Sequence, residues 1–183
     1  GVEESPAGIG GALLCGRLVA QRHKQGHLTN FHLHFTEIDR DSAAALAEFE
    51  GDLWIAADKW TDDALIALQA HRGSLRIDPT HIDDEVGVAL SRRGKGSGLE
   101  IRYGLSHWQV EYRDFSITDG AAKSLSEYPG ALRIFGNIQM SATAAAHLVE
   151  RPSIDLYRSK LKPVARKIFE SAGSWTDKTW NRN

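Results

Sequence analysis

The chain has 183 residues, of which 42% are hydrophobic and 25% charged, proportions that are ordinary for one soluble globular domain. Its formal net charge of -2 provides no basic surface of the kind that attracts nucleic acid or anionic membranes, so we expect neither as a partner. A single cysteine rules out an internal disulfide framework, and with no signal peptide visible it favours a cytoplasmic location.

The two ends of the sequence differ from its centre. Residues 1–12 are rich in glycine and small residues without periodicity, which predicts a flexible lead-in. From Leu13 to Lys24 the apolar spacing favours a short helix that caps the first unit of the following domain. We expect the main domain to cover residues 13–158, and apolar residues at helical spacing predict a capping helix within residues 159–183, followed by a polar tail.

One 22-residue unit occurs twice in succession between Leu46 and Leu90. The first copy contains Gly51-x-Leu53-x-Ile55 followed by Trp60 and Leu68, and the second contains Gly73-x-Leu75-x-Ile77 followed by Ile82 and Leu90. Related segments occur before and after these copies, at Phe31-x-Leu33, Leu99-x-Ile101, Leu132-x-Ile134 and Ile154-x-Leu156. The unit that starts near Leu99 carries an insertion at residues 102–116, whose centre alternates like an extra strand.

Each unit predicts a short strand followed by a helix. The period of two in the strand segment buries one face, and the Thr or Asp residues that follow, such as Thr61 and Asp83, can cap the start of a helix. The glycine before each strand is expected to adopt a left-handed conformation at the helix end, at Gly51, Gly73, Gly98 and Gly130. Stacked units of this kind predict an α/β solenoid of about five or six strand-helix units, with a parallel sheet on one side and helices on the other.

The later part of the unit resembles the leucine-rich repeat, whose motif is Leu-x-x-Leu-x-Leu-x-x-Asn-x-Leu. The best matches are Leu53-Trp-Ile55-Ala-Ala-Asp58-Lys-Trp60 and Leu75-Arg-Ile77-Asp-Pro-Thr80-His-Ile82. The leading leucine of the motif is absent, because Glu50, Arg72 and Pro129 stand at its position. The resemblance covers about residues 28–156 and implies a divergent, bacterial-type member of a family that commonly binds other proteins.

In such a solenoid, the residues between and beside the strand hydrophobics line an exposed sheet. The candidate partner-binding residues at these positions are Trp54, Arg76, Asp78, Glu100, Arg102, Arg133 and Phe135. Trp and Arg are enriched at binding hot spots, which favours a protein or peptide partner. The alternative is that Trp54 packs under a loop while the charges pair along the sheet.

The 102–116 insertion supplies two further candidate residues, Trp108 and Tyr112, which share one face of its alternation. Long insertions in repeat proteins usually project from one face, often the functional one. The alternative is a hairpin that covers the sheet. Our main hypothesis is therefore a non-enzymatic binding module that uses both the sheet and the insertion.

Two other functions stay open. A histidine cluster at His27, His32 and His34 is a weak candidate for zinc or copper, although no cysteine or acidic residue completes a known spacing motif. The chain also fits a structural or sensor segment of a larger protein. We expect no catalysis and no cofactor, because Arg93-Gly-Lys-Gly-Ser-Gly98 lacks the ending of a phosphate-binding loop and reads as a turn.

Overall fold

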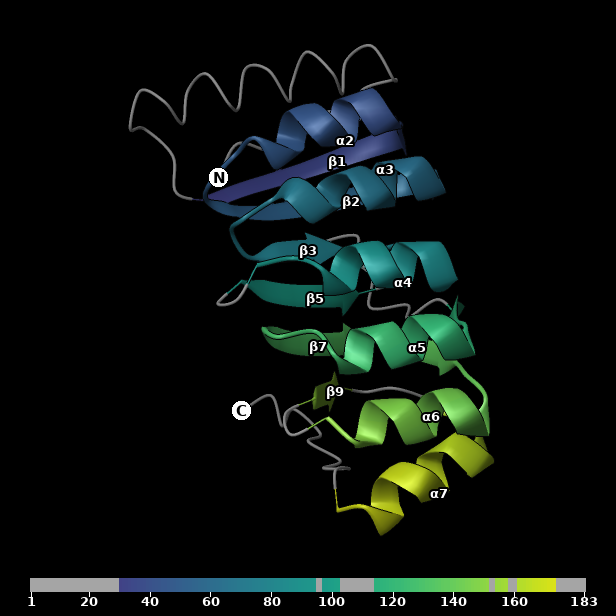
Figure 1. Ribbon diagram of the computed structural model, residues 1–183. Helices are drawn as coiled ribbons and strands as arrows, with labels where there is room; N and C mark the ends of the chain where they lie inside the picture. The colour runs from purple at the N-terminus through teal and green to yellow at the C-terminus, as the bar shows by residue number, and fades with distance from the viewer. Residues whose placement is uncertain (1–29, 95–96, 103–113, 152–153, 158–160, 174–183) are drawn as a thin grey trace, which may run out of the picture.

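The computed structural model describes residues 30–94, 97–102, 114–151, 154–157 and 161–173. Within them the chain builds a mixed α/β structure around a six-stranded parallel sheet (Figure 1). The strands lie in chain order: β1 (Asn30–Ile38), β2 (Asp52–Trp60), β3 (Leu75–Ile77), β5 (Gly98–Arg102), β7 (Ala131–Phe135) and β9 (Ile154–Tyr157). The predicted parallel sheet is confirmed, and the register pairs Leu53 with Leu75 and Leu75 with Leu99.

The helices lie side by side along one side of this sheet (Figure 1). They are α2 (Arg40–Ala47), α3 (Asp62–Ala67) with the 3-10 turn η1 (Leu68–Ala70), α4 (Asp84–Ser91), α5 (Asp119–Ser126), α6 (Ala142–Val149) and α7 (Pro163–Ser171). α7 lies within the range where the sequence predicts a C-terminal helix, and its Ala165 and Phe169 are buried. No helix in the described ranges is long and apolar enough to cross a membrane.

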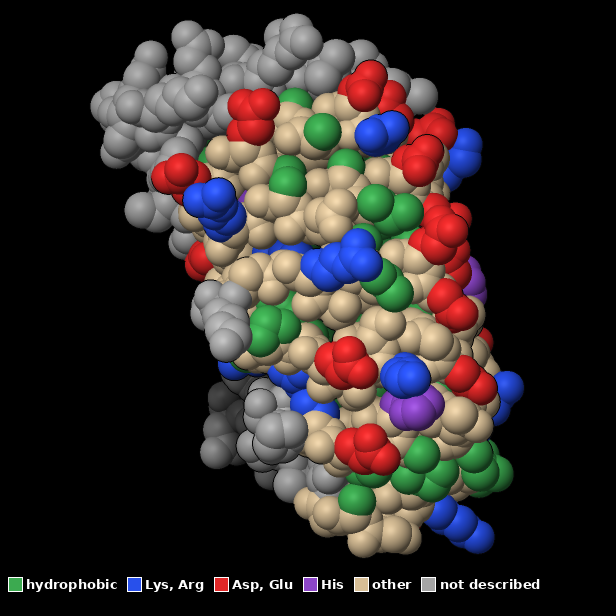
Figure 2. All heavy atoms as spheres, in the orientation of Figure 1, with side chains coloured by type: hydrophobic (Ala, Val, Ile, Leu, Met, Phe, Trp, Pro, Cys, Tyr) green, Lys and Arg blue, Asp and Glu red, His purple; other side chains and the backbone are tan. Residues whose placement is uncertain are grey.

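Polar caps fix where the helices begin. The side chains of Thr61, Asp83 and Thr118 each accept a hydrogen bond from the backbone N–H three residues later, as the sequence predicts. Asp39 and Ser141 cap α2 and α6 in the same way. Acidic side chains gather along the edge where the helices begin (Figure 2), which suits the positive end of each helix dipole.

The core lies between the sheet and the helices. Leu53, Leu75, Leu99 and Leu132 form one buried column on the strands, and Ile55, Ile77, Ile101 and Ile134 form a second. The helices oppose these columns with Leu46, Leu68, Leu90, Leu125 and Leu148, each fully buried. A leucine and an isoleucine per strand and one leucine per helix therefore build a continuous core, and alanines such as Ala64 and Ala121 let the helices lie close to the sheet.

A second, three-stranded parallel sheet is absent from the sequence prediction. It consists of β4 (His81–Ile82), β6 (Asp114–Ile117) and β8 (Asn137–Gln139). β1 and β2 run straight through nine residues each, whereas the later units divide into two strands at a corner. The corner falls at Asp78-Pro79 in one unit and at Gly136, with φ of 120°, in another. Proline lacks the N–H that a continuing ladder needs, so the strand ends there.

The predicted role of the glycines before the strands is wrong. Among the described residues only Gly136 and Gly173 have a positive φ, and helices end in ordinary right-handed caps such as Glu48 and Arg92. The glycines instead allow neighbouring units to touch. A Cβ on Gly73 would lie 2.0 Å from the carbonyl oxygen of Gly51, and a Cβ on Gly130 would lie 2.0 Å from that of Ser97.

Two buried arginines join neighbouring units close to these contacts. Arg93 is 1% exposed, and its guanidinium donates to the backbone carbonyls of His71, Gly73 and Gly98. Arg151 is 7% exposed and donates to carbonyls at the end of α5 and in the turn after it. Both guanidinium groups are thus bonded to several backbone carbonyls, and those at the end of α5 lie where the helix dipole favours a positive charge. Arg93 is therefore a structural residue of the glycine-rich turn.

Four of the predicted segments lie outside the described residues. They are the lead-in at residues 1–12, the capping helix between Leu13 and Lys24, the strand at the centre of the insertion, and the polar tail after residue 173. The ends of the insertion are described, and they belong to different sheets, since β5 ends at Arg102 and β6 begins at Asp114.

Replacing Gly73 by alanine tests the close contact between units. We expect Gly73→Ala to lower the free energy of unfolding by about 1–3 kcal/mol, because the new methyl group overlaps the Gly51 carbonyl and the backbone must shift. Gly94→Ala is the matched control, since nothing lies within 4 Å of its added Cβ, and we expect a change within about 0.5 kcal/mol. Urea unfolding of both variants measures the difference, and equal stabilities would contradict the explanation.

Candidate binding face of the parallel sheet

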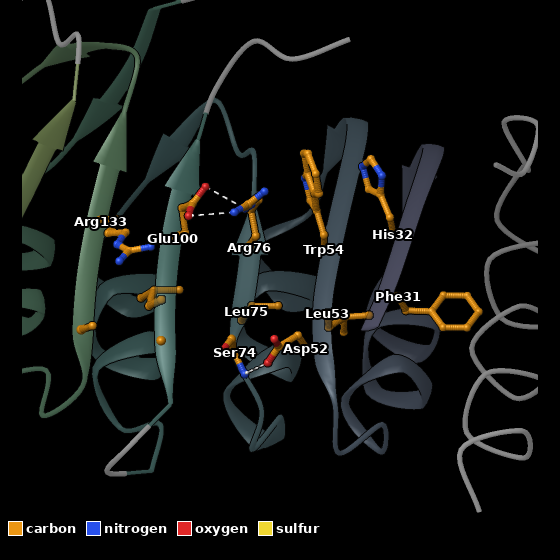
Figure 3. A pocket seen from close by; sticks show the side chains of 13 residues that line it. Phe31, His32, Asp52, Leu53, Trp54, Ser74, Leu75, Arg76, Glu100 and Arg133 are labelled. Atoms are coloured by element: carbon orange, nitrogen blue, oxygen red, sulfur yellow. Dashed lines mark hydrogen bonds and ion pairs between the residues drawn. The ribbon is translucent and has the colours of Figure 1, made fainter. Parts of the chain in front are cut away.

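The sheet brings five polar or aromatic side chains into one row on the face turned away from the described helices. The register pairs His32 with Trp54, Trp54 with Arg76, Arg76 with Glu100, and Glu100 with Arg133. Trp54, Arg76, Glu100 and Arg133 each lie between two buried core residues of their strand, and His32 lies between the half-buried Phe31 and the buried Leu33, so the five side chains point away from the helices. We call these five residues the sheet row, and Figure 3 shows them side by side.

Trp54 is held between two other planar groups. The His32 ring stacks on it with a centroid distance of 3.7 Å and an interplanar angle of 18°. On the side of β3, the Arg76 guanidinium carbon lies 4.3 Å from the Trp54 ring centroid, which is a cation–π geometry. Both faces of the indole are therefore in contact with row neighbours, and the half-buried Trp54 is held in one orientation.

Arg76 also holds Glu100 through a bidentate ion pair. Its Nε lies 2.7 Å from Glu100 Oε1, and its Nη2 donates to Oε2 at 3.0 Å. Arg102 approaches the same carboxylate, with its Nε 3.7 Å from Oε1, and its guanidinium carbon lies 4.7 Å from the Phe135 ring centroid. Glu100 is 8% exposed, so the arginines compensate a charge that is largely out of water.

A hollow with a volume of about 770 Å³ lies beside the sheet row. Small or short side chains precede the row on four adjacent strands, and they form part of the hollow's lining: Asp52, Ser74, Gly98 and Ala131. Next to them project the longer side chains of Trp54, Arg76 and Arg133 (Figure 3). The hollow thus results from a row of short side chains next to a row of long ones.

The hollow contains residues that the sequence analysis does not single out. Asp52, Ser74 and the half-buried Phe31 line it, and the Asp52 carboxylate accepts a hydrogen bond from the Ser74 N–H at 3.3 Å. The sequence feature that could have pointed to the hollow is the short side chain before the first strand leucine in successive units. Its meaning becomes visible only when the strands are placed side by side.

The sequence analysis assigns Asp78 to partner binding, whereas in the structure its carboxylate forms hydrogen bonds within the protein. Its Oδ1 accepts hydrogen bonds from the Ala57 backbone N–H and from Trp60 Nε1, both at 3.0 Å. The carboxylate thus ties the later half of β2 to the chain just after β3, where Pro79 interrupts the strand. Burial raises the pKa of Asp78 to about 7, outweighing the two hydrogen bonds, which act in the opposite direction.

The remaining candidates are placed in different surroundings. Arg133 is exposed and Phe135 is half-buried, both on β7, whereas Trp108 and Tyr112 lie outside the described residues. His32 stacks on Trp54, and the Nε2 of His34 lies 3.7 Å from Asp58 Oδ1. His27 also lies outside the described part of the chain. Within that part, no group of three or more His, Cys, Asp or Glu residues is arranged to hold a metal ion.

The burial of Asp78 predicts a pH dependence of stability. Because its pKa is raised from 3.8 to about 7 on folding, the folded protein keeps a proton that the unfolded chain releases between these values. This group therefore makes the free energy of unfolding fall as the pH rises from 5 to 8. Asp78→Asn keeps an oxygen acceptor and cannot titrate, so we expect a flatter profile and a variant that is more stable relative to wild type at pH 8 than at pH 5.

Urea unfolding at pH 5, 6, 7 and 8 measures both profiles. Asp63→Asn, an exposed carboxylate in the first turn of α3, controls for the loss of one surface charge. Identical pH profiles for wild type and Asp78→Asn would contradict the assignment.

The Arg76–Glu100 pair predicts a second difference in stability. Arg76→Met leaves a largely buried carboxylate without its bidentate partner, and we expect the free energy of unfolding to fall by about 2–3 kcal/mol. The exposed Arg133→Met is the matched control, with an expected loss of at most about 1 kcal/mol. Adding Glu100→Gln to Arg76→Met removes the uncompensated charge and should recover part of the loss. If chemical denaturation shows that Arg76→Met/Glu100→Gln is no more stable than Arg76→Met, the uncompensated charge of Glu100 is not the cause of the loss.

Comparison with known proteins identifies no relative of this chain. No protein-family model matches it, and searches of curated proteins and of solved structures return no significant match. The functional interpretation therefore depends on the chemistry of the sheet face itself.

Proposed function

We propose that the chain is a divergent solenoid of the leucine-rich-repeat type that acts as a non-enzymatic binding module for a protein or peptide. The observation that carries this proposal is the in-register row His32–Trp54–Arg76–Glu100–Arg133 beside a hollow of about 770 Å³. The repeated strand-helix units, with all described helices on one side of the sheet, support the solenoid interpretation.

The residue types in the row suit recognition of a partner. Trp and Arg are over-represented among residues that dominate binding energy, because they combine a large contact area with directional polar groups. Trp54 and Arg76 are held in place by stacking and by the ion pair to Glu100. Side chains fixed before binding lose less conformational entropy when a partner arrives.

The same contacts favour binding over catalysis. Glu100 supplies the carboxylate of the row; it is 8% exposed, and both of its oxygens contact the Arg76 guanidinium. A general acid or base needs an oxygen within hydrogen-bond reach of the substrate, whereas both oxygens of Glu100 are engaged by Arg76. Contributions of Trp108 and Tyr112 from the insertion to the same surface stay a prediction.

Affinity capture from a lysate of the source organism tests the proposal. We expect the native protein to retain a partner that the variant Trp54→Ala/Arg133→Glu loses, because the variant removes the central aromatic group and reverses an exposed charge of the row. The matched control is Lys123→Glu/Glu127→Lys, which exchanges two exposed charges on the helical side, one in the last turn of α5 and one at its C-cap. Thermal unfolding has to show that both variants are folded.

Two results would count against a binding function for this face. One is capture of the same proteins by the native chain and the row variant. The other is the absence of any protein that is retained specifically by the native chain and the control.

A further inference from the structure

An open groove with a volume of about 350 Å³ lies on the helical side, where α3 and α4 meet. Ile66 and Val88 line its centre, and both are half-buried. The exposed Asp84 and Glu85 line the end at which α4 begins, and the exposed Arg92 lines the end at which α4 stops. In Figure 2, hydrophobic and basic side chains lie over α3 and α4, with acidic ones toward the edge where the helices begin.

The charges at the two ends of the groove differ in their contacts within the chain. Asp84 accepts a hydrogen bond from the threonine that caps α5, and Ser91, on the same outer face of α4, donates to the Val88 carbonyl. Among the residues that the structure describes, the side chains of Glu85 and Arg92 take part in no hydrogen bond or ion pair. Both are therefore available for contact with another molecule.

Glu85 and Arg92 are placed so that α4 complements a reversed copy of itself. They are seven residues apart, and because Arg92 keeps helical backbone angles at the C-cap, this spacing is two turns, or about 10 Å along the helix. Both lie on the side of α4 that faces α3, with Val88 between them.

A two-fold axis that passes Val88, parallel to the helical layer and perpendicular to α4, reverses the direction of the helix. It leaves the side that faces α3 where it was. Glu85 then meets Arg92 of a second copy, and Arg92 meets Glu85 of that copy, around a centre formed by Val88 and Ile66. Reciprocal contacts of this kind are what a two-fold symmetric interface requires.

The equivalent positions of the other units lack this pattern. Counted from the N-caps, the positions of Glu85, Val88 and Arg92 hold Asp41, Ala44 and Glu48 in α2, Asp63, Ile66 and Ala70 in α3, Gly120, Lys123 and Glu127 in α5, and Thr143, Ala146 and Glu150 in α6. Among α2–α6, only α4 has opposite charges on either side of an apolar residue. In a reversed pair, acidic residues of α2 would meet each other, and so would two lysines of α5. α3 brings an apolar centre without like charges, so the complementary area is confined to α3 and α4.

We propose that this face of α3 and α4 is the interface of an antiparallel homodimer, with two reciprocal Glu85–Arg92 ion pairs around Val88 and Ile66. The antiparallel helix dipoles and the low net charge of -2 per chain both favour the pairing. The groove is small, so the dimer is weak and reversible, with a dissociation constant on the order of 100 μM. The interface does not involve the sheet row, and the dimer carries two such rows on opposite sides. The inference is independent of the proposed function.

Sedimentation equilibrium of the full chain at low salt, from about 10 μM to about 1 mM, measures the self-association. We expect a monomer–dimer equilibrium for the native protein. Glu85→Arg and Arg92→Glu should each weaken it at least about tenfold, because each variant places like charges in both contacts. An equimolar mixture of the two variants should associate about as tightly as the native protein, because both contacts of a mixed dimer again join unlike charges.

The exchange Lys123→Glu/Glu127→Lys is the matched control, since it alters charges on the neighbouring α5, and it should keep the native dissociation constant. Thermal unfolding has to show that all variants are folded. If a charge reversal prevents folding, the neutral variants Glu85→Gln and Arg92→Gln should each weaken the dimer about threefold or more.

Recovery of the dimer in the mixture supports the proposal. A native chain that stays monomeric up to about 1 mM would overturn it. So would a dimer that neither charge reversal weakens, or a mixture that associates no more tightly than the single variants. These results concern only the helical side, whereas the capture experiment with Trp54→Ala/Arg133→Glu reports on the sheet row.

Discussion

The close passage of one unit's backbone over the next, at the turn from helix to strand, is the constraint on which this structure depends. Adjacent parallel strands lie about 4.8 Å apart, so the turns that lead into them must approach equally closely. Gly73 and Gly130 make the approach possible because neither has a side chain to meet the carbonyl of the preceding unit. Arg93 and Arg151 then donate to backbone carbonyls at this edge, such as those of Gly73 and Leu125.

This stacking also creates the chemistry of the exposed face. Equivalent positions of successive units become neighbours, so planar side chains at one position of the unit meet face to face. His32, Trp54 and Arg76 stack in this way, and the next neighbour, Glu100, closes the series with an ion pair. The row therefore behaves as one connected group, in which a change at one residue alters the contacts of the residues beside it.

The sequence is sufficient to predict the main sheet, its order and most helix starts. The spacing of leucine and isoleucine fixes the register, and polar residues such as Thr61 and Asp83 mark the helix starts. The second sheet is not predicted from the sequence, because a strand as short as β4, with two residues, cannot show the alternation of apolar and polar residues. The burial of Arg93 and Arg151 is not predicted, because backbone carbonyls accept their hydrogen bonds. Every residue has such a carbonyl, so the sequence does not show which ones meet an arginine.

The candidate site is predictable to a similar degree. Alternation along the strands is enough to place Trp54, Arg76, Glu100 and Arg133 on one face. It does not reveal that Asp78 bonds to β2, because this contact depends on the corner that Pro79 introduces. Nor does it reveal the hollow, which depends on short side chains from four strands that are far apart in the sequence.

The corner between the two sheets has a consequence for how such a chain can change over evolution. Pairing on either side of the corner is independent of the length of chain between the two strands of a unit. Gly136 alone separates β7 from β8, whereas residues 103–113 separate β5 from β6, and yet both β5–β7 and β6–β8 keep a regular parallel register. Sequence can therefore be added or lost at the corner without a shift in the strand register, which makes the corner a natural place for new loops beside the candidate binding face.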